Sequence, residues 1–153
     1  MLEIALYHPQ IPQNTGTLLR VSSCLGIHVN LIGPLGFIFD DKRMKRAGMD
    51  YLSSASVSVH TSFEEFISKK PNHRLIALDI GEGAISYTKF KFSDNDILVV
   101  GSEHSGFEDR DLNFFDSRVI IPMVEGRRSM NMAIATSFVL GEAMRQLDLF
   151  DKF

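Results

Sequence analysis

The sequence predicts an α/β fold with a mostly parallel sheet that carries helices on both faces. Short apolar runs of strand length alternate with segments of helical periodicity along the chain. This alternation is typical of βα units, whose strands pair in parallel. No repeat or low-complexity tract interrupts the 153 residues, so we expect one domain spanning residues 1–153.

Six apolar runs, rich in Val, Ile and Leu, are the predicted strands. They are Glu3–Tyr7, Val29–Ile32, Val57–His60, Leu75–Asp79, Ile97–Val100 and Val119–Ile121. Each is short enough for a strand that is buried within a sheet.

The segments between these runs have helical periodicity and end at residues that terminate helices. The predicted helices are Thr15–Leu25 before Gly26, Asp41–Ala47 before Gly48, Phe63–Lys69 before Pro71, a short turn at Glu108–Phe114, and Asn131–Leu147. A helix start needs one capping side chain, and the last helix has two candidates, Ser129 and Asn131. One excess capping group does not by itself identify a site, so the rest of the chain has to decide whether this helix start belongs to one.

Composition excludes several classes of protein. The net charge of −3 and a pI of about 5.9 argue against a nonspecific polyanion binder. No apolar run reaches the roughly 20 residues that cross a bilayer, and the first residues lack a signal-peptide pattern, so we expect a cytoplasmic protein with no membrane partner. A single cysteine, Cys24, fits a reducing compartment, and its place in a helical pattern predicts a small core side chain.

Polar residues gather after three predicted strands, where open α/β sheets bind ligands. The segments are HPQIPQNTG (8–16), GSEHSGF (101–107) and PMVEGRRSMN (122–131). Glu103 stands out, because an acid at a strand end can bind or orient a hydroxyl group. Asn14 and Arg20 alone would be explained by helix capping and by an exposed position, but three polar loops on one sheet favour a common pocket.

Other sites are excluded by missing residues. The glycine-rich turn at 101–107 lacks the lysine of a phosphate-binding loop, and the first strand is not followed by a dinucleotide fingerprint. The five histidines are scattered, and His104 is predicted to be an ordinary loop residue. With one cysteine and no ligand cluster, we expect no metal site.

Four segments resemble a known family: LYHPQIPQNTGTLLR, GFIFDDKRMKRAGMDY, VGSEHSGF and IPMVEGRRSMN. They are similar to the motifs of SPOUT-class RNA methyltransferases, in particular the small branch that 2′-O-methylates the wobble nucleotide of tRNA. The resemblance implies a C-terminal trefoil knot, use of S-adenosylmethionine with S-adenosylhomocysteine as product, and a homodimer. It also implies an anticodon-loop substrate with cytidine or modified uridine at position 34, and a leucine tRNA is the expected one.

The resemblance assigns roles to individual residues. It places the methyl donor at Leu78, Gly101, Ile121, Met123 and Ser129, and the transfer site at Arg20, Glu103 and Asn131. An arginine keeps its proton at ordinary pH, so we expect Arg20 to organise phosphate and hydroxyl groups rather than act as a base. Clustered cations are the candidate RNA-binding residues: Lys42, Arg43, Lys45, Arg46, Arg127 and Arg128.

The chain departs from the family pattern in its last helix, where Ala133 replaces a serine and Gly141 an aromatic residue. These departures leave open an RNA-binding protein without catalysis. Methylation of another tRNA site or of rRNA is a second alternative. For the dimer, we expect a partner-facing stripe on the last helix at Phe138, Met144 and Leu147.

Overall fold

A computed structural model describes residues 1–40, 55–127 and 129–153, and it confirms the α/β class. Within these residues the chain forms a seven-stranded sheet in the order β3-β2-β1-β6-β4-β7-β5, and all its strand pairings are parallel. The strands are β1 (Glu3–Tyr7), β2 (His28–Ile32), β3 (Val57–His60), β4 (Arg74–Leu78), β5 (Ile85–Ser86), β6 (Asp96–Val100) and β7 (Ser117–Ile120).

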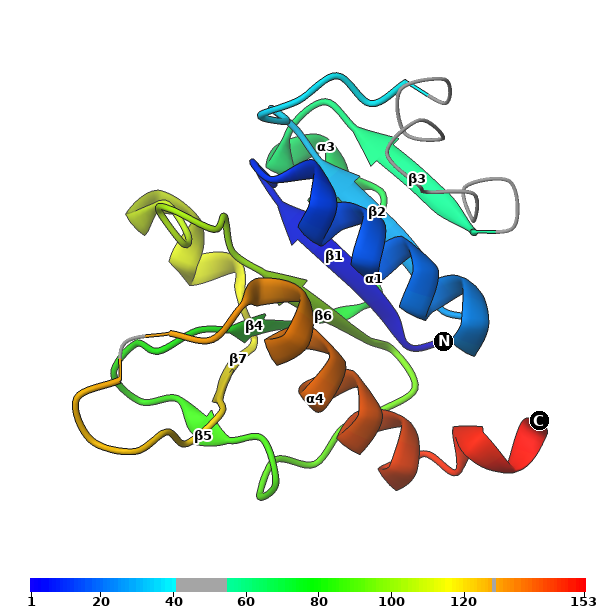
Figure 1. Cartoon of the computed structure of the whole chain (residues 1–153), viewed down its shortest axis with the longest axis vertical. Helices are drawn as coiled ribbons and strands as arrows, with labels where there is room; N and C mark the ends of the chain where they lie inside the picture. Colours follow the sequence, from blue (N-terminus) through cyan, green and yellow to red (C-terminus); the bar gives the residue numbers. More distant parts are fainter. Residues whose placement is uncertain (41–54, 128) are drawn as a thin grey trace.

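Helices cover both faces of the sheet, as the alternation of elements predicts (Figure 1). In the described parts of the chain, the α-helices are α1 (Pro12–Leu25), α3 (Phe63–Ser68) and α4 (Met132–Gln146), and η2 (Asp109–Phe114) and η3 (Leu149–Lys152) are 3-10 helices. α1 and α4 lie side by side on one face, and α3 lies on the other. The predicted helix Asp41–Ala47 lies outside the described residues.

Successive residues of β1 show how the sheet separates two cores. Ile4 and Leu6 pack in the cluster that includes residues of α1 and α4, whereas Ala5 and Tyr7 pack in the cluster that includes residues of α3. Because side chains alternate along a strand, a central strand buried on both faces is apolar throughout. This continuous burial explains why the apolar runs predict the main strands to within two residues.

The start of α1 differs from the prediction by three residues. The helix begins at Pro12, whose fixed φ suits the first helical position, and its N-cap Ile11 makes no side-chain capping bond. Asn14 therefore lies inside the helix and is not its cap. At the other end, the helix stops at Gly26 in the left-handed conformation, as predicted.

The prediction of a buried Cys24 is wrong, because its side chain is exposed. Positions 13, 17, 20 and 24 are all exposed and recur at helical spacing, so they form the outer face of α1. Among the described residues, none of the helices is long and apolar enough to span a membrane.

Candidate functional site

A cavity of about 560 Å³ lies at the carboxyl ends of β4, β6 and β7. Its walls are formed by residues 78–80, 100–104, 106–107, 120–121, 123 and 129–132, together with Ile11, Asn14 and Ala135 at the starts of α1 and α4. This is the edge of the sheet at which the sequence predicts a site. The five residues assigned to the methyl donor all line the cavity: Leu78, Gly101, Ile121, Met123 and Ser129.

The segment after β6 is a tight turn that brings two glycines together. Ser102 and Gly106 exchange two backbone hydrogen bonds, of 3.0 and 2.9 Å, and Gly106 has a φ of +64°. A Cβ atom on Gly101 would lie 2.9 Å from the Gly106 backbone, which is closer than Cβ atoms come to other atoms. The turn therefore needs glycine at 101, and it directs Glu103 toward α1.

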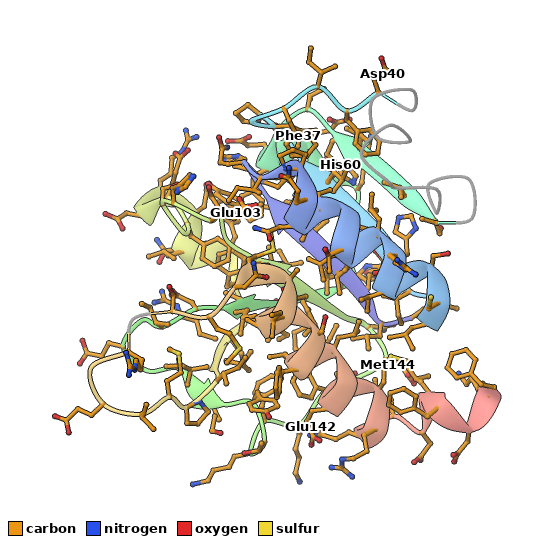
Figure 2. All side chains as sticks on the ribbon, viewed as in Figure 1. Phe37, Asp40, His60, Glu103, Glu142 and Met144 are labelled. Atoms are coloured by element: carbon orange, nitrogen blue, oxygen red, sulfur yellow. The ribbon has the colours of Figure 1, made fainter. Side chains whose placement is uncertain are left out.

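Glu103 joins this turn to the segment before α1 (Figure 2). Its Oε2 accepts a hydrogen bond from the backbone N–H of Gln10 at 2.7 Å, and its Oε1 accepts one from that of Ile11 at 3.1 Å. Oε1 also accepts from the Asn14 side-chain amide at 3.3 Å. The carboxylate thus satisfies amides at the start of α1, where the helix dipole favours negative charge.

Asn14 carries the connection on to α4. Its Oδ1 accepts a hydrogen bond from the Asn131 amide at 3.0 Å. Asn131 in turn caps α4, because its Oδ1 accepts from the backbone N–H groups of Ala133 and Ile134 at 3.0 and 3.2 Å. Glu103, Asn14 and Asn131 thus form one polar relay on the cavity wall, and Asn131, not Ser129, is the helix cap.

Arg20 lies apart from this relay. It is exposed on α1 and is not among the residues that line the cavity. It lies six positions after Asn14, which is about 9 Å along a helix axis. Among the candidate RNA-binding residues, Arg127 is exposed on the segment between β7 and α4. Lys42, Arg43, Lys45, Arg46 and Arg128 lie outside the described residues.

A second acidic residue of the cavity escaped the sequence analysis. Asp79 follows β4 directly, and its Oδ1 accepts a hydrogen bond from the backbone N–H of Ile80 at 2.8 Å. Its Oδ2 lies 3.8 Å from Nη1 of Arg118 on β7. It was predicted as the last residue of the strand Leu75–Asp79, whereas β4 ends at Leu78. A predicted strand end one residue earlier would have identified it by the signal that singled out Glu103. His104, predicted to be an ordinary loop residue, also lines the cavity.

Behind the turn at 101–107, Tyr7 of β1 is buried and donates a hydrogen bond to Asp111 of η2. Burial raises the pKa of Tyr7, and the Asp111 carboxylate raises it further, so the hydroxyl keeps its proton at neutral pH. The neighbouring His8 stacks on the Tyr7 ring, and burial lowers its pKa. Tyr7 is therefore a structural donor in the protonated state, and His8 is mostly neutral at pH 7.

The cavity is chemically suited to an organic ligand. Its volume falls within the usual range for small-molecule sites. Apolar side chains line it beside turns whose backbone groups can form hydrogen bonds. Among the described residues, no group of three or more His, Cys, Asp and Glu side chains is arranged to hold a metal ion.

A second hollow, of about 620 Å³, lies over α4. Ile134, Phe138 and Gly141 line it at helical spacing, together with Thr17 of α1 and Phe150 of η3. Ile134 and Phe138 are each 52% exposed. Met144 (Figure 2) is buried in the core, so its prediction as a partner-facing residue is wrong, and Leu147 packs partly against the same core.

Comparison with known proteins agrees with this geometry. The chain is 42% identical over 151 residues to a Beijerinckia indica subsp. indica protein named tRNA (cytidine(34)-2'-O)-methyltransferase, covering 97% of this chain and 94% of that protein. A structure solved for insights into the 2-OH methylation of C/U34 on tRNA has a TM-score of 0.88 and 37% identity, covering 97% of both chains. The SpoU methyltransferase AviRb from Streptomyces viridochromogenes, in complex with the cofactor AdoMet, has a TM-score of 0.84 and 25% identity, covering 96% of this chain and 60% of that chain. A family model matches residues 1–141, and the chain belongs to the SpoU rRNA Methylase family.

Proposed function

We propose that this protein transfers a methyl group from S-adenosylmethionine to the ribose 2′-hydroxyl of nucleotide 34 in tRNA. The observation that carries the proposal is the cavity at the ends of β4, β6 and β7, which is lined by the predicted donor-binding residues and bordered by the Glu103 relay. The names of full-length relatives support the wobble nucleotide, cytidine or modified uridine, as the target. A leucine tRNA is the proposed substrate, and the cytoplasm is the proposed place of action.

The residues of the cavity fit the methyl donor. Leu78, Ile121 and Met123 offer an apolar surface for the adenine, and Gly101 lets the backbone of Gly106 pack closely against it in the turn beside them. When bound, S-adenosylmethionine supplies an activated methyl group on a positively charged sulfur. Transfer of that group to a hydroxyl oxygen needs alignment and removal of a proton, and it needs no metal.

Each polar residue then has a distinct task. Glu103 holds the start of α1 against the donor loop, and Asn131 holds the start of α4 in the same arrangement. The guanidinium of Arg20 binds RNA phosphate and stabilises negative charge that develops on the ribose oxygen. Alignment is the main contribution of the relay, because small displacements of reacting groups cost large factors in rate.

A second copy of the chain completes the proposed enzyme. The hollow over α4 exposes Ile134 and Phe138, and its edge includes Thr17, which shares the outer face of α1 with Arg20. A homodimer through this hollow would cover the apolar stripe. It would also bring Arg20 to the boundary between two protomers. The RNA surface would then be composite, with Arg127 and the cations at 42–46 facing phosphates.

The trefoil knot belongs to the same proposal. The residues that line the cavity come from chain positions far apart, at 78–80, 100–104 with 106–107, and 120–121 with 123 and 129–132. In the proposed topology the segment before α4 passes through the loop formed by the preceding part of the chain. Such threading is rare among folds. It would hold the donor loops together without any disulfide.

Mass mapping of tRNA from a strain that lacks the gene tests the function. We expect the loss of one ribose methyl group at nucleotide 34 and its return when the gene is restored. Unchanged methylation of every anticodon loop would refute the proposal. Loss of a methyl group from another tRNA position or from rRNA would move the activity to that site.

The substitution Arg20→Ala tests the division of tasks. We expect methylation to fall below detection while the Kd for S-adenosylhomocysteine changes less than about threefold, because the proposed partners of Arg20 belong to the RNA. Calorimetry and a methyl-transfer assay measure the two quantities. Equal losses of donor binding and turnover would place Arg20 in the donor pocket instead.

The homodimer has its own test. Sedimentation at micromolar concentration should give twice the 17.2 kDa mass of one chain. Phe138→Glu should shift the protein toward the monomer and lower its activity, because it places a charge in the apolar stripe. A wild-type protein that stays monomeric at these concentrations would refute the dimer.

A further inference from the structure

Two carboxylates line the cavity, and they differ in what remains available to a ligand. Both oxygens of Glu103 accept hydrogen bonds from the protein, three in total. Asp79 uses only Oδ1, which accepts from the Ile80 backbone N–H. Among the described residues, no hydrogen bond reaches Asp79 Oδ2, so this oxygen can accept one from a bound molecule.

The surroundings of Asp79 keep this oxygen accessible. The side chain is 22% exposed and belongs to the cavity wall, so it is neither sealed in the core nor fully solvated. Two residues further on is Gly81, where an added Cβ would lie 2.7 Å from Oδ2 and 3.0 Å from Arg118 Nη1. Glycine at this position therefore leaves room for the carboxylate and its neighbouring guanidinium.

Arg118 determines which kind of hydrogen-bond donor suits this carboxylate. Its Nη1 lies 3.8 Å from Oδ2, which is too long for a hydrogen bond but close enough to offset the negative charge. A cationic ligand group would be attracted by the Asp79 carboxylate and repelled by the Arg118 guanidinium. A neutral hydroxyl avoids this conflict, and it still donates a strong hydrogen bond to an ionised oxygen.

We infer that Asp79 binds a ribose hydroxyl of the adenosine part of the methyl donor and thereby selects a ribonucleoside ligand. The inference rests on the proposed function, because it assumes that the cavity holds this donor. A ribose presents two neighbouring hydroxyl groups, either of which can reach one carboxylate oxygen. Asp79 is then a specificity residue of the site, whereas Glu103 holds its walls together.

A purely structural role for Asp79 makes a different prediction. In that case the carboxylate only fixes the turn after β4, through the Ile80 N–H and Arg118. Removing it would weaken every ligand of the cavity by the same factor, whether or not the ligand carries the hydroxyl. Removing the Asp79 carboxylate and the ligand hydroxyl, each alone and both together, therefore distinguishes the binding role from the structural role.

Calorimetry with S-adenosylhomocysteine and its 2′-deoxy and 3′-deoxy analogues makes this comparison. For the wild type, we expect one analogue to bind about tenfold more weakly or worse, as for a hydrogen bond to a charged group. Asp79→Ala should bind the parent ligand with a similar loss and should not distinguish it from that analogue. Asp94→Ala is the control, because Asp94 is exposed and does not line the cavity.

Asp79→Asn guards against a folding defect, because its side-chain oxygen can still accept from the Ile80 N–H. We expect it to unfold at the wild-type temperature and to distinguish the analogue by less than about threefold, since its amide nitrogen does not accept a hydrogen bond. Full discrimination by both Asp79 variants would overturn the inference alone. Failure of the wild type to bind S-adenosylhomocysteine would overturn the proposed function and this inference with it.

Discussion

The segments after β6 and β4 each place one carboxylate on the wall of the same cavity, and the two carboxylates differ in their hydrogen-bond partners. After β6, both oxygens of Glu103 already have partners within the protein, because they accept hydrogen bonds from Gln10, Ile11 and Asn14. After β4, Asp79 keeps one oxygen without a hydrogen bond from the described residues, 3.8 Å from Arg118. An acidic residue after a strand thus has two uses, and hydrogen-bond partners distinguish them where sequence position does not.

The difference separates positioning from binding. Glu103 ties the turn at 101–107 to α1, and through Asn14 and Asn131 it reaches the start of α4. A change there moves several walls of the cavity at once. A change at Asp79 affects one wall, next to one strand. We therefore expect larger and less selective effects from Glu103 than from Asp79.

The largest effect should come from Glu103→Ala. It leaves two backbone amides and the Asn14 side chain without their acceptor, so we expect a loss of about 2–4 kcal/mol in the free energy of unfolding. Turnover should fall about 100-fold or more, since displaced walls misalign the reacting groups. Urea unfolding and single-turnover methylation measure the two losses.

The control for this substitution is Glu125→Ala, because Glu125 is exposed and does not line the cavity. It should change neither quantity appreciably. If Glu103→Ala were as stable as the wild type, the positioning role would be contradicted, and Glu103 would no longer differ from Asp79 in this respect.

A smaller effect separates helix capping from the relay at Asn131. Asn131→Asp keeps the oxygen that caps α4 but loses the N–H donor to Asn14, whereas Asn131→Ala loses both. We expect Ala to cost about 1–2 kcal/mol of stability, and Asp to cost about 0.5 kcal/mol or less. Both should lower turnover.

Thermal unfolding of the two Asn131 variants, with Asn14→Ala as the partner in a double-mutant cycle, gives the coupling energy of this hydrogen bond. A coupling energy near zero would mean that the hydrogen bond between Asn14 and Asn131 does not stabilise the protein.

The smallest effect concerns the pH dependence of stability and a residue that does not line the cavity. His60 on β3 is buried, its Nε2 lies 3.0 Å from Asn30 Oδ1, and its Nδ1 has no partner among the described residues. Burial lowers the pKa of His60, and the charge of Lys69 lowers it further. The unfolded chain therefore binds this proton more readily, so the stability from His60 is complete above about pH 6.5 and is lost as the pH falls through the folded-state pKa.

We expect His60→Gln to reduce the loss of stability between pH 7.5 and 5.5 by less than about 1.4 kcal/mol. Urea midpoints at the two pH values measure it. His8 and His28, whose pKa values burial also lowers, remain in the variant as a background. An unchanged pH dependence would show that His60 does not contribute.

Much of the fold follows from the sequence, because burial on both faces makes the main strands continuously apolar. The two-residue strand β5 escaped, since a segment so short has no measurable periodicity. The exposure of Cys24 was also missed, because the prediction followed the usual burial of a small side chain and not the position of Cys24 on the outer face of α1. Met144 was predicted to face a partner but is buried, because an apolar residue on α4 is compatible with either position.

The site was predicted in part. Strand ends and the family resemblance identify Glu103, Asn131 and the residues that line the cavity. They do not reveal the Asn14 link, because a hydrogen bond between residues 117 positions apart leaves no local pattern. They also overlooked Asp79, because it was counted as the last residue of a predicted strand.

The central claim is that this cavity serves methyl transfer to the ribose of nucleotide 34. The most direct measurement offers purified protein and labelled S-adenosylmethionine to two leucine-tRNA anticodon stem-loops, one with cytidine and one with 2′-deoxycytidine at position 34. We predict one methyl group per cytidine stem-loop, located by mass spectrometry on that ribose, and none on the deoxy substrate. Equal labelling of both stem-loops, or a methyl group at any other nucleotide, would contradict the claim.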